Sequence, residues 1–320
     1  MAKVYYKRIL SEKIKKILQS NYEWIIDYVK KHPELDFQTG SNKSSSWFSV
    51  YRGTGCVLSI KASGKTVADQ KYMALCPEFY RNPSPERFNV LLKKINDNSD
   101  FDHFYANSDL SHKKEGYFQS LIGRRYSFEV KGDDDFFIID KELVIGFDNE
   151  NVRCEWNQPI KDSIASWIEK VRTVFFPTKL PKNISTSYGE FDFLALNWEG
   201  DIIIMELKQD SSEKTYLSPF QISFYKQQFE KLLKELPNLS EDIMEMIKQK
   251  IDLGILVLPS DRKLPSKLSG KIKYYLIVGE ECKLPAEICD RYKRIKEIVL
   301  PELEAFTCDE KGTLKPSERL

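Results

Sequence analysis

Two carboxylates and one lysine lie at the matching ends of two short apolar runs, 191–198 and 202–207. Asp192 stands near the start of the first run, and Glu206 and Lys208 stand at the end of the second. The Glu-Gly connection between the runs is typical of a β-hairpin. Antiparallel pairing brings the start of one strand beside the end of the other, so we expect Asp192 close to Glu206 and Lys208. Period-2 alternation also puts Glu206 and Lys208 on one face.

This combination of side chains indicates divalent-metal chemistry. Charges at the end of a buried strand are costly unless they are paired or bound to a cation. Two converging carboxylates, Asp192 and Glu206, make an oxygen site suited to Mg²⁺ or Mn²⁺. Lys208 could then orient or deprotonate an attacking water, or stabilise charge on a phosphate.

A helix is predicted from Pro219 to about Leu236, and it carries Gln221 and Tyr225 four residues apart on one face. Both residues have a structural alternative. Ser218, Pro219 and Gln221 fit the N-cap, N1 and N3 positions of a capping box, in which Gln221 holds the helix end. Tyr225 can equally be a half-buried core tyrosine.

Together these residues resemble the PD-(D/E)xK nuclease superfamily and, more narrowly, its RecB-type branch. The motifs are Gly189-x-x-Asp192, Glu206-Leu207-Lys208 and Gln221-x-x-x-Tyr225. The resemblance covers the second half of the chain and implies an α/β, restriction-endonuclease-like core of order αβββαβ with a mixed central sheet. Phe191 stands where the superfamily name has a proline.

The resemblance also implies roles for individual residues. Asp192 and Glu206 would bind the catalytic metal, and Lys208 would act on the water or the scissile phosphate. Gln221 and Tyr225 would contact the substrate backbone or support the metal shell.

Many members of the superfamily use a further acidic residue on the first core helix. Glu169 is the candidate here, on a helix predicted from about residue 160 to 176. The alternative for Glu169 is an ordinary solvated helix residue.

The length of 320 residues favours two domains. A polar, proline-containing stretch at 148–159 predicts the boundary near residue 150. Residues 1–150 are expected to form a smaller mixed α+β domain with a role in substrate or partner recognition. Residues 151–320 are expected to form the nuclease-like domain.

Hydrophobic periodicity predicts the remaining elements. Helices are expected over 11–31, from 83–85 onward, over 241–250 and over 285–296. Strands are expected over 47–51, 56–61, 72–75, 126–130, 136–139, 143–147, 251–258 and 271–278. A polar loop is expected over 39–46.

The formal net charge of +1 gives no overall basic signal, so a nucleic-acid partner would have to meet a local patch. Basic and aromatic residues mix in Tyr5-Tyr6-Lys7-Arg8 and in Arg124-Arg125-Tyr126. These runs could meet phosphates and bases, or they could be scattered surface charge.

Six scattered cysteines without a C-x-x-C pair indicate reduced thiols rather than a zinc ribbon or an iron–sulfur cluster. Without an apolar run of about 20 residues or the apolar core of a signal peptide, we expect a cytoplasmic protein with no membrane partner.

The predicted function is divalent-metal-dependent hydrolysis of phosphodiester bonds, with DNA as the expected substrate. The alternative is a non-catalytic nucleic-acid-binding module. RNA as substrate, endo- or exonuclease action and the oligomeric state stay open.

Overall fold

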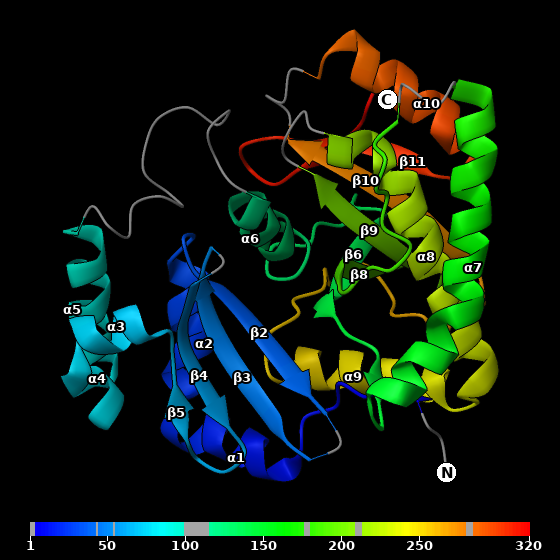
Figure 1. The fold of residues 1–320 in the computed structure, drawn as a ribbon. Helices are drawn as coiled ribbons and strands as arrows, with labels where there is room; N and C mark the ends of the chain where they lie inside the picture. Colours follow the sequence, from blue (N-terminus) through cyan, green and yellow to red (C-terminus); the bar gives the residue numbers. More distant parts are fainter. Residues whose placement is uncertain are drawn as a thin grey trace.

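The computed structural model describes residues 4–42, 44–53, 55–98, 115–175, 180–208, 213–279 and 284–320 (Figure 1). It is a mixed α/β structure with two principal sheets. The elements up to residue 98 are β1 (Val4–Tyr5), α1 (Glu12–Asn21), α2 (Glu23–Lys31), β2 (Asp36–Ser41), β3 (Ser46–Arg52), β4 (Gly55–Lys61), β5 (Thr66–Val67), α3 (Gln70–Leu75), α4 (Pro77–Arg81) and α5 (Pro85–Asn96). Those that follow are α6 (Glu115–Arg125), β6 (Phe136–Leu143), β7 (Gly146–Phe147), α7 (Glu150–Phe175), β8 (Phe191–Asn197), β9 (Ile202–Lys208), α8 (Glu213–Glu235), α9 (Leu239–Asp252), β10 (Ile272–Gly279), α10 (Ala286–Val299), β11 (Glu304–Cys308) and β12 (Leu314–Pro316).

The smaller sheet is antiparallel, in the order β2-β3-β4-β5, and shares a core with α1, α2 and α5. Two predicted strands are confirmed: β3 for 47–51 and β4 for 56–61. Two predicted helical regions are also confirmed: the pair α1–α2 for 11–31, and α5 for the helix from 83–85. The strand predicted over 72–75 is wrong. These residues belong to the short helix α3, which buries one residue, Tyr72, and leaves Met73 exposed. The loop predicted over 39–46 is in part strand, since β2 extends to Ser41.

The larger sheet has the order β12-β11-β10-β9-β8-β6 and is mixed: β9, β10 and β11 are parallel, and the other neighbours are antiparallel. Its two faces bury different cores. One is covered by α7, α8, α9 and α10, and the other by α6. Figure 1 shows α7 and α6 on opposite sides of this sheet.

The strand pairing does not follow the boundary predicted near residue 150. β6 lies before that position and pairs with β8, which lies after it, from Phe136↔Asn197 to Leu143↔Phe191. Nor is 148–159 an irregular linker. Asn149 accepts a hydrogen bond from the backbone N–H of Val152 at 3.0 Å, so it caps α7, which begins at Glu150 and continues through Pro159.

The helix predicted to begin at Pro219 begins instead no later than Glu213. A proline inside a helix removes the hydrogen bond to the carbonyl four residues earlier. Here the carbonyl of Thr215 accepts a hydrogen bond from the Ser218 hydroxyl at 2.7 Å, which satisfies the group that Pro219 cannot reach. The capping-box alternative for Gln221 is therefore wrong, because Gln221 lies in the interior of α8.

Three further predictions are confirmed: β10 for the strand over 271–278, α9 for the helix over 241–250 and α10 for the helix over 285–296. The strand predicted over 251–258 is wrong. α9 ends there at Asp252, and Gly254 follows with a φ of +70°, which lets the N–H groups of Ile255 and Leu256 return to the carbonyl of Lys250. The strand predicted over 126–130 is also wrong, because these residues form a loop. Arg125 holds this loop in place by donating hydrogen bonds to the carbonyl of Glu129 and to the Asp134 carboxylate.

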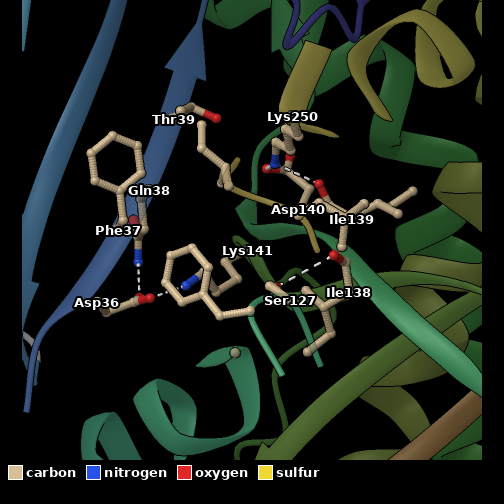
Figure 2. Close-up of a pocket in the computed structure, with 14 residues that line it drawn as sticks. Asp36, Phe37, Gln38, Thr39, Ser127, Ile138, Ile139, Asp140, Lys141 and Lys250 are labelled. Atoms are coloured by element: carbon tan, nitrogen blue, oxygen red, sulfur yellow. Dashed lines mark hydrogen bonds and ion pairs between the residues drawn. The ribbon is translucent and has the colours of Figure 1, made fainter. Parts of the chain in front are cut away.

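Charged side chains join the two sheets at a small cavity between them (Figure 2). Lys141 of β6 forms an ion pair with Asp36 of β2. On the other side of the cavity, Asp140 pairs with Lys250 at 3.4 Å and with Arg8 at 3.2 Å. Of these buried pairs, Lys141–Asp36 joins β6 to the first strand of the smaller sheet, and the two pairs of Asp140 join β6 to α9 and to the N-terminal segment. Among the described residues, no helix is both long and apolar enough to cross a bilayer.

Candidate active site

The predicted hairpin is confirmed as β8 and β9, which pair antiparallel with Phe193 opposite Met205. Gly200 makes the connection with a φ of +90°. Continuing the register by one residue sets Asp192 opposite Glu206. The Asp192 carboxylate accepts a hydrogen bond from the backbone N–H of Leu207 at 2.7 Å. The hairpin therefore gathers Asp192, Glu206 and Lys208 at one end of the larger sheet.

Glu206 and Lys208 are buried, with 2% and 7% of their surface exposed, and Asp192 is half-buried. Lys208 Nζ forms an ion pair with Glu206 Oε1. The second oxygen, Glu206 Oε2, is also buried, and no N–H or hydroxyl group of the described residues donates to it, while the Asp192 carboxyl lies within hydrogen-bond reach of the Glu206 carboxyl. A buried carboxylate oxygen without a partner is costly, and it is the kind of group that a cation would satisfy.

The electrostatics of the cluster follow from burial and mutual repulsion. Burial raises the pKa of Asp192 well above its usual range, and the neighbouring Glu206 raises it further. Burial also raises the pKa of Glu206 to about 7, against the opposing effect of Lys208. Burial alone would lower the pKa of Lys208, but the two carboxylates outweigh it and the pKa is raised. Lys208 therefore stays charged at neutral pH, whereas the carboxylates hold protons more tightly than usual.

Gln221 and Tyr225 share one face of α8, as predicted. Gln221 Nε2 donates to the Tyr225 hydroxyl at 2.8 Å, and that hydroxyl donates to the backbone carbonyl of Glu190. The Tyr225 ring is buried, with its centroid 4.4 Å from that of Phe191. Burial and the nearby Glu206 raise the pKa of Tyr225. The tyrosine is thus a core residue that also fixes α8 to the start of β8, two residues from Asp192.

The structure does not bring Glu169 to the cluster. Its side chain is 75% exposed on α7 and lies 3.6 Å from Arg172, so Glu169 is a solvated helix residue. Among the described helices, α6 begins with an exposed acidic residue, Glu115, that lies near enough to influence the cluster through its charge. Its charge raises the pKa of Asp192, Glu206 and Lys208, each after larger effects of burial and of the other cluster charges.

Tyr188 is a second residue that the sequence reasoning missed. Burial and the charge of Glu206 raise its pKa, and its ring lies 6.3 Å from that of Tyr225. The helical spacing of Phe118, Ile122 and Arg125 could have revealed α6 and with it Glu115. No comparable local pattern marks Tyr188, because it lies outside the helices and strands, before β8.

The residues fit a hydrated cation better than a fully enclosed one. In the described part of the chain, no group of three or more histidine, cysteine or acidic side chains has the geometry of a metal site. Asp192 and Glu206 form a pair with one unsatisfied oxygen. Mg²⁺ commonly binds to one or two carboxylates and keeps several waters, so this pair suits it.

Comparison with known proteins adds no identification: no family model, no curated protein and no solved structure matches the chain.

Proposed function

We propose that this protein is a divalent-metal-dependent nuclease that hydrolyses phosphodiester bonds, with DNA as its expected substrate. The observation that carries the proposal is the cluster of Asp192, Glu206 and Lys208 at the end of the hairpin, with a buried Glu206 Oε2 that no N–H or hydroxyl group of the described residues reaches. A strand end placed in a core has no structural need for two carboxylates whose pKa values are raised by burial. Such a site is better explained by a cation that binds there.

The arrangement of elements supports a restriction-endonuclease-like core of the PD-(D/E)xK type and its RecB-type branch. The order α6, β6, β8, β9, α8, β10 has the αβββαβ pattern that the resemblance implies, with β7 and α7 inserted after the first strand and α9 inserted before the last. The four strands are neighbours in the order β6-β8-β9-β10, and β9 and β10 are parallel. In this alignment α6 is the first core helix, so Glu115 takes the place expected for Glu169.

Asp192 and Glu206 would hold the cation, and Glu115 would add negative charge beside it. When bound, Mg²⁺ or Mn²⁺ activates water and neutralises charge on the phosphate. Lys208, fixed by its ion pair with Glu206, would place a positive charge against a phosphate oxygen or orient the water. Gln221 and Tyr225 would position the start of β8 rather than react.

A digestion panel tests this function. Linear, circular and single-stranded DNA and an RNA of the same sequence would be incubated with the protein in Mg²⁺, in Mn²⁺ and in EDTA. We expect cleavage of DNA that requires the divalent cation. Linear-only cleavage would define an exonuclease, and cleavage of circles an endonuclease. Absence of metal-dependent cleavage of every substrate would contradict the proposal.

One observation favours the alternative, a module that binds nucleic acid without cutting it. Glu206 and Lys208 are almost fully buried and paired with each other. If oligonucleotide binding persists while cleavage is absent in both metals, this alternative replaces the nuclease.

A further inference from the structure

A hollow of about 380 Å³ lies between the smaller sheet and the edge of the larger one. Its walls come from both halves of the chain: β2, β3 and the N-terminal segment on one side, and the end of β6 with residue 190 on the other. The lining residues used below are Tyr5, Lys7, Trp47, Glu142 and Glu190. A second hollow, of about 960 Å³, shares Tyr5, Lys7, Ser41 and Asn42 with the first, so the two are adjacent and are together called the groove below.

Two aromatic rings in this groove lie across glycines of the neighbouring strands. Trp47 pairs with Gly40, and a Cβ at Gly40 would come within 2.3 Å of the Trp47 ring. Tyr5 pairs with Gly146, where a Cβ would come within 2.1 Å of the Tyr5 ring. Each glycine therefore allows a ring to lie flat against the backbone. Both rings are half-buried and line the hollow, so each provides an aromatic surface there.

The charges indicate which part of a nucleotide would enter the hollow. Among its cationic residues, Lys141 is paired with Asp36 and Arg8 with Asp140, whereas Lys7 is exposed and forms no ion pair within the described residues. Glu142 and Glu190 place two carboxyl groups on the opposite wall. Those groups disfavour a phosphate inside the hollow. A neutral base is compatible with them, and Lys7 stands where the groove continues.

The hollow ends close to the candidate active site in the sequence, at Glu190, just before β8. Glu190 lines it, and the carbonyl of the same residue accepts the hydrogen bond of Tyr225. Asp192 follows two residues later, about 7 Å along an extended chain at roughly 3.3 Å per residue. A strand with a base in the hollow would thus have a phosphate within one or two nucleotides of Asp192.

We propose that this groove binds a single-stranded segment of nucleic acid, with one base stacked on Trp47 or Tyr5 in the hollow. The inference rests on the proposed function for the identity of the ligand and adds single-strand recognition to it. The adjacency of the two hollows favours a strand, which can extend from one to the other, over a free mononucleotide. Stacking on aromatic rings is tolerant of sequence, so we expect little preference among bases.

The test is a binding measurement in EDTA, where no cutting can occur. A fluorescently labelled thymidine octamer is titrated with the parent protein, with Trp47→Leu and with Trp167→Leu, and anisotropy is followed. Leucine keeps an apolar side chain over Gly40 but removes the aromatic face. Trp167 is a matched control, since it is a half-buried tryptophan of α7 that packs beside Lys170. We expect Trp47→Leu to bind about tenfold more weakly and Trp167→Leu to bind as the parent does.

An octamer with the same phosphates but abasic sugars separates base stacking from charge. The parent should bind it about as weakly as Trp47→Leu binds the normal octamer. Equal binding of the two octamers by the parent, an unchanged affinity in Trp47→Leu, or no binding at all would overturn the inference. Binding that depends on Trp47 in a protein that cuts nothing would uphold the groove and reject the nuclease.

Discussion

The raised pKa of Glu206 makes the stability of the fold depend on pH in a way that a divalent cation should remove. The carboxyl group has a pKa of about 7 in the folded protein, against 4.5 ordinarily. It therefore binds its proton more tightly when folded, and its contribution to stability is complete below about pH 4.5. That contribution is lost as pH rises to about 7, because ionisation then occurs in the buried site.

The difference between the two pKa values corresponds to about 3 kcal/mol at 1.36 kcal/mol for each pH unit. With an unfolding entropy of about 2.1 cal/mol/K per residue, this is a fall of about 5 °C in Tm for a chain of 320 residues. The raised pKa of Asp192 acts in the same direction and adds to the fall. Lys208 does not contribute, because its pKa is raised from 10.5, above this pH range.

Thermal unfolding followed by circular dichroism between pH 5 and pH 8 measures this effect. In EDTA we expect Tm to fall across that range by about 4 °C more than in Glu206→Gln, which cannot ionise at this position; the rest of the fall occurs below pH 5. Mg²⁺ at 10 mM should restore much of the loss at pH 8, because a cation that binds only the folded state stabilises it. Glu206→Gln should respond little to Mg²⁺. A parent protein with the same pH profile as Glu206→Gln, or an equal response of both to Mg²⁺, would refute the reasoning.

Three substitutions test the roles of other residues. Lys208→Met should lower the rate of Mg²⁺-dependent DNA cleavage at least 100-fold, because the ammonium group is lost. The apolar stem is kept, so circular dichroism should still show a folded protein. Cleavage at the parental rate would remove Lys208 from the site. Glu115→Gln should raise the Mg²⁺ concentration for half-maximal cleavage about tenfold. Glu169→Gln, the matched control, should leave that concentration unchanged. Equal effects of the two substitutions would contradict the place given to Glu115. Tyr225→Phe removes the hydroxyl that joins Gln221 to the chain before β8 and should destabilise the fold by about 1–3 kcal/mol in urea unfolding; a midpoint equal to that of the parent would show that these hydrogen bonds are dispensable.

The hairpin could be predicted because its determinants are local. Two apolar runs joined by Gly200 define the strands, the turn and the register together, and the register alone sets Asp192 opposite Glu206. Burial of Glu206 could also be expected, from the apolar residues that precede it in β9. The position of Gln221 and Tyr225 on one face of a helix needed only their spacing of four residues.

The errors arise where distant or compensating contacts decide. The start of α8 was predicted at Pro219, but the hydroxyl of Ser218 replaces the hydrogen bond that the proline removes. Glu115 could not be assigned to the cluster because its approach depends on α6 packing against the far face of the larger sheet. Glu169 is the candidate only if the helix just before the hairpin is the first core helix; in the structure a strand that precedes this helix, β6, pairs with β8, and α6 comes before β6.

The pairing of β6 with β8 limits how this protein can be divided. A fragment beginning at residue 151 would keep Asp192, Glu206 and Lys208 but would lose the strand that covers the outer edge of β8. The backbone N–H and C=O groups from Phe191 to Asn197 would then face solvent as an open edge, which favours association between chains. Genetic exchange of the second half alone would therefore transfer the candidate catalytic groups without the strand that covers this edge.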